Sequence, residues 1–157
     1  MIAAMKASIF PCAIVLTVAL GALNAVYADS ATWNLNPTSG DWTTAANWTP
    51  ATVPNGPSDT ATFASSGVTD VSIRALVQLD GIVFDVGADA FIISNTPRVV
   101  LTISGVGITN NSGVLQNFVN QQNLRSAGQL YFTNGATAET RSFTLIRQRN
   151  AAERSSR

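Results

Sequence analysis

Val99-Val100-Leu101-Thr102-Ile103-Ser104 is a run of mostly β-branched residues whose second half alternates apolar and polar side chains. A period of two residues places successive side chains on opposite faces of a strand, so the run predicts a strand with one buried face. Gly105 and Gly107 follow it and indicate a turn. Runs of the same kind lie on both sides of it, at Thr60–Phe63, Val71–Arg74, Ile82–Asp85, Phe91–Ser94 and Leu130–Thr133.

The polar residues at the ends of these runs bear on how the strands are arranged. Ser94-Asn95, Asn110-Asn111 and Thr133-Asn134 each follow a β run. In a solenoid, equivalent turns stack on one another, and their Asn side chains can form a ladder between coils. The sequence therefore predicts an all-β fold, a short right-handed parallel β-helix, with a β-sandwich as the alternative. The stretch 114–124 contains three Asn residues, and we interpret it as a loop with a β-edge.

The N-terminal residues have the features of a secretory signal peptide. Lys6 supplies a positive charge, and a mostly apolar run from Ile9 to Leu23 follows it. Val26 and Ala28 stand at the two positions that a signal peptidase reads, which predicts cleavage after Ala28. The apolar run is shorter than the roughly 20 residues of a membrane span. We therefore expect an exported protein, secreted or associated with the cell surface, with no membrane span after removal of the signal.

The signal peptide, the turn signals and the strand pattern divide the chain into four segments. They are a signal peptide (1–28), an irregular Trp-rich N-terminal cap (29–60), the β-helix rungs (61–140) and a disordered basic tail (141–157). The tail holds five Arg and one Glu, whereas the body between residues 29 and 140 holds eight acidic residues and three Arg. An acidic body disfavours nucleic acid as a partner, because the phosphates repel it.

The composition removes several kinds of chemistry. The chain has no His, and its single cysteine, Cys12, leaves with the signal peptide. The mature protein therefore lacks the commonest general base, and it can form neither a disulfide nor a thiolate metal site. No metal-binding or cofactor-binding motif occurs in the chain, so we assign no catalytic residue, no metal and no cofactor.

A series of Trp-, Asn- and Gly-containing motifs runs through most of the mature chain. The motifs are Trp33, Gly40-Asp41-Trp42, Ala46-Asn47-Trp48, Val53-Pro54-Asn55-Gly56, Asp59-Thr60-Ala61-Thr62-Phe63, Gly81-Ile82-Val83-Phe84-Asp85, Leu101-Thr102-Ile103-Ser104-Gly105 and Phe132-Thr133-Asn134-Gly135. Together they resemble the N-terminal head of bacterial autotransporter-like exported proteins with autotransporter-associated β-strand repeats.

This resemblance implies a parallel β-helix passenger that is displayed at, or released from, the cell surface. The implied role is structural or adhesive, without catalytic activity. After Ala138 the family would continue with Gly-rich repeats, whereas this chain continues with Glu139-Thr140-Arg141. We therefore expect the chain to correspond to a fragment, the start of such a passenger.

Three tryptophans, Trp33, Trp42 and Trp48, are close together in the irregular segment. Large aromatic side chains can cover the open end of a β-helix, where apolar groups and unpaired backbone would otherwise meet water. This cap is the interpretation that we favour. The second interpretation is a glycan-binding site, because aromatic faces stack on sugars.

An enzymatic alternative depends on the acidic residues Asp80, Asp85 and Asp89, which bracket a strand and a turn. A glycosidase needs two carboxyl groups about 5–10 Å apart. The mature chain has no Lys to assist them, and Arg74 and Arg98 stand alone in the sequence. We therefore favour solvated turn residues over a carbohydrate-active site. Surface glycans, or a second copy associating through the open β-helix end, remain as partner hypotheses.

Overall fold

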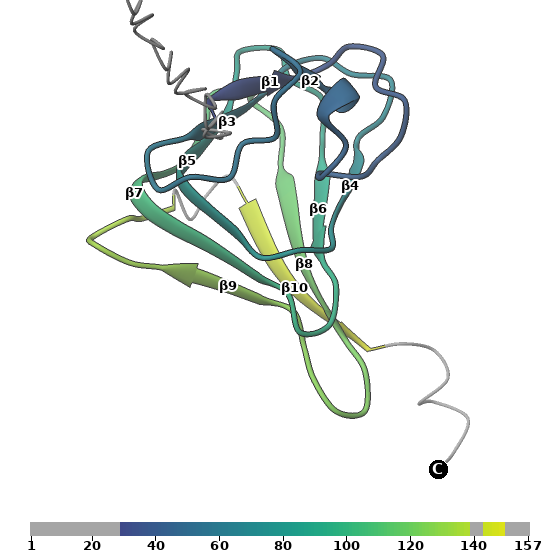
Figure 1. Ribbon diagram of the computed structural model, residues 1–157, viewed down its shortest axis with the longest axis vertical. Coiled ribbons are helices and arrows are strands. Elements are labelled where there is room, and N and C mark those ends of the chain that lie inside the picture. The colour runs from purple at the N-terminus through teal and green to yellow at the C-terminus, as the bar shows by residue number, and fades with distance from the viewer. Residues whose placement is uncertain (1–28, 139–142, 150–157) are drawn as a thin grey trace, which may run out of the picture.

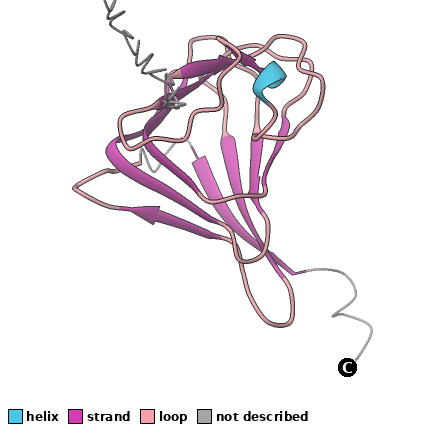
Figure 2. Ribbon diagram, in the orientation of Figure 1, coloured by secondary structure: helices cyan, strands magenta, loops and turns pink. Residues whose placement is uncertain are grey.

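The computed structural model describes residues 29–138 and 143–149 of the chain, and these residues form two sheets that the chain visits alternately (Figure 1). The fold is all-β, a parallel β-solenoid of about three turns. Its one short 3-10 helix, η1 (Ala45–Asn47), lies in the N-terminal part, and loops join the strands (Figure 2). The predicted signal cleavage at Ala28 lies outside the described residues.

Ten strands make up the two sheets. Sheet A has the order β2-β1-β3-β5-β7-β9, and sheet B has the order β10-β8-β6-β4. The strands are β1 (Ala31–Trp33), β2 (Trp48–Thr49), β3 (Thr60–Phe63), β4 (Asp70–Ile73), β5 (Val77–Phe84), β6 (Ile92–Asn95), β7 (Val100–Asn110), β8 (Gln116–Gln122), β9 (Gln129–Phe132) and β10 (Phe143–Arg149).

From β3 to β8, each strand pairs in parallel with the strand two places further along the chain. Parallel partners share a face, so buried side chains stack from coil to coil. In sheet A, Ala61 pairs with Ile82, and Ile82 pairs with Ile108; all three are buried. The parallel ladders confirm the predicted β-helix and exclude the sandwich, whose sheets are antiparallel.

Aromatic side chains form a continuous column along the inside of the coils. The Phe63 ring stacks on Phe84, with ring centroids 5.2 Å apart, and lies 4.9 Å from the ring of Phe91. Phe84 continues the column to Phe118, at 6.3 Å and edge to face. All four rings are at most 1% exposed. Aromatic pairs at such separations add to the stabilisation that the buried area provides.

An irregularity in sheet A absorbs a difference in length between two coils. Leu79 of β5 pairs with Ile103 of β7, and the next pair along the ladder is Gly81 with Gly107. Between these two pairs β7 has more residues than β5, so β7 bulges at this point. Gly107 has φ +95°, and a Cβ there would lie 2.0 Å from the carbonyl oxygen of Thr137. Glycine is therefore required where this bulge meets the following coil.

Two sequence predictions are corrected by the strands of sheet B. The stretch predicted as a loop contains β8, in which Phe118 is buried while Asn117 and Asn120 are half-buried. Part of the predicted disordered tail forms β10, which pairs with β8 over its whole length. In both cases the unpaired backbone of the preceding coil offers a template, and its hydrogen bonds outweigh the local preference of Asn or Arg for other structure. The remainder of the predicted tail lies outside the described residues.

An Asn ladder forms between coils, but it does not link the turns from which it was predicted. The Asn95 side-chain amide donates to Asn120 Oδ1 at 3.0 Å and to the Gln129 carbonyl, also at 3.0 Å. Asn110 instead accepts from the backbone N–H of Ser112 within its own turn. The ladder therefore joins successive strands of sheet B and ties them to the start of β9.

We expect Phe84→Ala to lower the free energy of unfolding by about 3–5 kcal/mol, because it opens a cavity in the middle of the aromatic column. Urea denaturation followed by far-ultraviolet circular dichroism measures this loss. Val86→Ala is the matched control: Val86 is 87% exposed just after the same strand, so the change should stay within about 0.5 kcal/mol. Equal losses in the two variants would contradict the role of the column.

Candidate functional site

At the N-terminal end of the solenoid, the first parallel strand of each sheet is covered by another segment of the chain. In sheet A, β2 pairs antiparallel with β1 and ends the sheet there. In sheet B, the segment 40–42 lies along β4: the Ser72 N–H donates to the Gly40 carbonyl at 2.7 Å, and the Trp42 N–H donates to the Ser72 carbonyl at 3.1 Å. The contact is so close that a Cβ on Gly40 would lie 2.2 Å from the Asp70 carbonyl oxygen.

The three tryptophans fill the space beneath this closure. Trp33, Trp42 and Trp48 are at most 1% exposed, and their rings contact one another and Phe63 at centroid distances of 4.8–6.1 Å. Each indole N–H donates to a backbone carbonyl, at 2.8–3.1 Å. In this conformation no indole face is open to a sugar, and the tryptophans pack as a cap on the aromatic column.

A buried amide holds the loop of the cap in place. Asn47 is 0% exposed. Its Oδ1 accepts from the backbone N–H and the hydroxyl of Thr38, both at 2.8 Å, and its Nδ2 donates to the Asp41 carbonyl at 2.8 Å. A buried amide with its donors and acceptors satisfied fixes a loop, because breaking the network leaves desolvated polar atoms.

The acidic residues of the enzymatic alternative do not converge. Asp80 lies inside β5, and Asp85 follows the end of the same strand. Five residues of strand span about 16 Å, beyond the separation of a glycosidase pair. Asp89 faces the previous coil, where its Oδ2 accepts from Ser65 Oγ at 2.9 Å and from the Ser66 N–H at 2.8 Å. Asp89 therefore links two coils.

Within the described residues, β9 and β10 are the last strands at the C-terminal end of the solenoid (Figure 1). Among the described residues, no strand pairs with the outer edge of β9 or of β10. Phe132 pairs with the buried Ile103, and Leu145 pairs with the buried Phe118, so both side chains share the interior face. They are nevertheless 38% and 54% exposed. The last coil thus presents apolar side chains and unpaired backbone groups that earlier coils bury.

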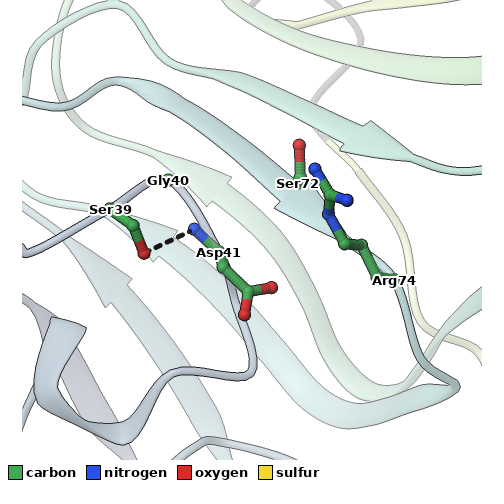
Figure 3. A pocket seen from close by; sticks show the side chains of 5 residues that line it. All are labelled: Ser39, Gly40, Asp41, Ser72 and Arg74. Carbon is green, nitrogen blue, oxygen red and sulfur yellow. Dashed lines mark hydrogen bonds between the residues drawn. The ribbon is translucent and has the colours of Figure 1, made fainter.

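A polar hollow of about 430 Å³ lies where the cap meets β4, and Figure 3 shows the residues that line it. Ser39, Gly40 and Asp41 come from the cap, and Ser72 and Arg74 come from β4 and the position just after it. The sequence did not reveal this site, because the cap residues and the β4 residues that line it are about 30 residues apart in the chain. Only the backbone bridge between Asp41 and Ser72 brings the two segments together. The sequence offered no signal beyond Asp41 itself.

The electrostatics of the hollow keep Asp41 ionised. Partial burial raises the pKa of Asp41, but hydrogen bonds from Thr43 and Thr44 and the positive charge of Arg74 outweigh it, and the pKa lies below its ordinary value. Asp41 Oδ2 accepts from the two threonine hydroxyls at 2.8 and 3.0 Å. A carboxylate and a guanidinium, both charged at neutral pH, therefore line the same hollow.

The comparisons with known proteins give no identification. No protein-family model matches the chain, and no curated protein or solved structure matches it significantly. Within the described residues, no three acidic, His or Cys side chains are grouped as a metal would require. A search of the same residues finds no helix long and apolar enough to cross a membrane.

The contact of Asp89 with the previous coil predicts a pH dependence. The Ser66 N–H and the Ser65 hydroxyl hold the pKa of Asp89 below its ordinary value. The carboxylate therefore stabilises the fold above that ordinary value, and the stabilisation is lost as the pH falls through the lowered pKa. We expect Asp89→Asn to lose less thermal stability than the unchanged protein between neutral pH and about pH 3.

An NMR titration of the Asp89 carboxyl carbon supplies the direct measurement. Ser65→Ala removes one of the two donors, so it should move the pKa of Asp89 back toward the ordinary value. A pKa of Asp89 that is ordinary in the unchanged protein would rule out the stabilising contact.

Proposed function

We propose that this chain is the capped starting section of an exported β-solenoid, with a structural or adhesive role at the cell surface and no catalytic activity. The observation that carries the proposal is the difference between the two ends. At the N-terminal end, β2 covers β1, the segment 40–42 covers β4, and the tryptophans are buried beneath them. The C-terminal coil exposes Phe132 and Leu145 and, within the described residues, leaves the outer edges of β9 and β10 unpaired. One end starts the solenoid, and the other is built to receive further coils.

General properties of solenoids support this assignment. A single coil cannot bury its apolar face alone, so solenoid proteins stack coils and protect their terminal ones. Unprotected strand edges are a liability for a finished protein, because they pair with other chains. The proposal of an exported chain rests on two features of the sequence, the predicted signal peptide and the resemblance of the Trp-, Asn- and Gly-containing motifs to autotransporter-like heads.

The carbohydrate-active alternative receives less support. Asp80 and Asp85 are too far apart along β5 for paired catalysis, and Asp89 is engaged by Ser65 and Ser66. Release of reducing sugar from a panel of bacterial and plant polysaccharides by the full chain would overturn the structural proposal.

A directional extension tests the proposed function. We expect a second copy of residues 74–128, joined after Arg149, to stack on the open coil. The extended chain should unfold in a single transition with a larger denaturant dependence, because one cooperative unit then exposes more surface. Urea denaturation monitored by circular dichroism measures both quantities.

The matched control places the same copy between Ala28 and Asp29, ahead of the cap. Sheet A ends there on the two-residue antiparallel strand β2, which is too short to template a parallel coil, so the added segment should unfold separately or stay unfolded. Equal stabilisation from the two positions, or a separate transition for the C-terminal copy, would contradict a solenoid that grows from one end.

Export is tested independently. We expect a bacterial host to release a mature chain that begins at Asp29, and intact-mass spectrometry of the exported protein identifies its first residue. Ala28→Arg should block processing, because signal peptidase requires a small residue before the cleaved bond. A mass that retains residues 1–28 in the exported, unchanged protein would remove the signal peptide from the proposal.

A further inference from the structure

The polar hollow lies where the cap segment 40–42 pairs with β4, but that pairing uses backbone groups and leaves the side chains that line the hollow out of it. It opens on the outward side of sheet B, between the cap segment 39–41 and the strand β4 (Figure 3). Ser72 and Arg74 are two residues apart, so in extended backbone they project from the same face. Asp41 forms a backbone β-bridge with Ser72, so it lies next to Ser72 and Arg74. Side chains from two segments distant in sequence therefore converge on one place.

The hollow combines an acceptor with donors that are not used up within the fold. Asp41 is an ionised carboxylate whose Oδ2 already accepts from the Thr43 and Thr44 hydroxyls. Its Oδ1 accepts only from the Thr43 N–H, at 3.4 Å, so this oxygen can accept a further hydrogen bond. Arg74 is exposed, and in the described part of the chain no direct hydrogen bond or ion pair to its guanidinium is found, although its charge acts on Asp41. Its donors are therefore open to a ligand.

The hydroxyl groups of Ser39 and Ser72 are further hydrogen-bonding groups in the lining of the hollow. Ser39 Oγ accepts from the Asp41 N–H at 3.3 Å and from Asn47 Nδ2 at 3.0 Å, which leaves its own proton free to donate. Ser72 is half-buried on the facing strand. Because Asn47 and the strand pairing fix both segments, these groups are held in place before any ligand arrives, which reduces the entropy cost of binding.

We propose that this hollow binds a sugar unit through adjacent hydroxyl groups. One hydroxyl of a diol can donate to the Asp41 carboxylate, and its neighbour can accept from Arg74. Hydrogen bonds to charged groups are the stronger ones. The net charge of the Asp–Arg pair is zero, which suits a neutral ligand. A volume of about 430 Å³ lies within the range of small-molecule sites.

A small zwitterion, such as a free amino acid, is the competing ligand. It would place its ammonium on Asp41 and its carboxylate on Arg74. In an open hollow such ion pairs are screened by water and gain little. A sugar can use the two serine hydroxyls in addition to the charged pair, so the four groups together favour the sugar.

The test is a titration of the full mature chain, labelled with ¹⁵N, with glucose, galactose, mannose and glycine in turn. We expect at least one of the sugars to shift the amide signals of Gly40, Asp41, Ser72 and Arg74, and glycine to leave them in place. Arg74→Gln should weaken the binding by about tenfold or more, the loss expected for a hydrogen bond to a charged group. Ser72→Ala should weaken it less.

Arg125→Gln is the matched control, since Arg125 is an exposed arginine in the loop between β8 and β9. It should bind the sugar as the unchanged protein does. Three results would each overturn the proposal: no sugar shifts these signals at the highest concentrations, Arg74→Gln binds as well as the unchanged protein, or glycine binds in preference. Unchanged circular dichroism of the variants separates lost binding from lost folding.

Discussion

Parallel pairing between successive coils is the constraint on which the rest of this structure depends. It requires that each inward-facing side chain rest on the equivalent side chain of the coil before it, and it brings Phe63, Phe84 and Phe118 into one column. It also leaves every coil incomplete, because half of its backbone hydrogen bonds across the sheet belong to the next coil. Any finite solenoid of this kind must therefore protect or pair the strand edges and apolar side chains at its two ends.

The chain deals with its ends differently. At the N-terminal end, β2 reverses direction and the segment 40–42 covers β4, while the tryptophans close the column. At the C-terminal end, β9 and β10 leave interior positions exposed. The cap has a second effect. By laying Asp41 beside Ser72, it creates the polar hollow on the outer surface, so a device that ends a sheet also assembles side chains from distant segments.

Much of the fold could be predicted from the sequence, because strand periodicity is local. The alternation in Leu101–Ser104 predicted a strand, and the polar residues after the strands favoured a β-solenoid over a sandwich. Features that depend on a neighbouring coil could not be predicted. Asn120 favours a turn by itself, yet it lies in β8, where its backbone pairs with that of Asn95 and its side chain accepts a hydrogen bond from Asn95. Arg147 made the C-terminal region look like an unstructured tail, although its backbone pairs with that of Asn120.

The candidate site was less predictable still, because Arg74 has no acidic neighbour in sequence. Only the pairing of the cap with β4 places Asp41 beside it. The tryptophans were conspicuous in sequence, but burial decides what they do. The tryptophans are buried in the cap, whereas the polar groups that line the hollow are scattered along the sequence.

The clustering of all three tryptophans in the cap has an optical consequence. Trp42 and Trp48, with ring centroids 4.8 Å apart, are close enough for their indole transitions to couple, and none lies beyond residue 48. Emission from tryptophan, excited at a wavelength that tyrosine does not absorb, therefore reports the state of the N-terminal end, without a contribution from Tyr131 in β9. Loosening of β9 and β10 would not change this emission. Hydrogen exchange of the amides in β9 and β10 would detect it, so the two measurements would report on opposite ends of the molecule.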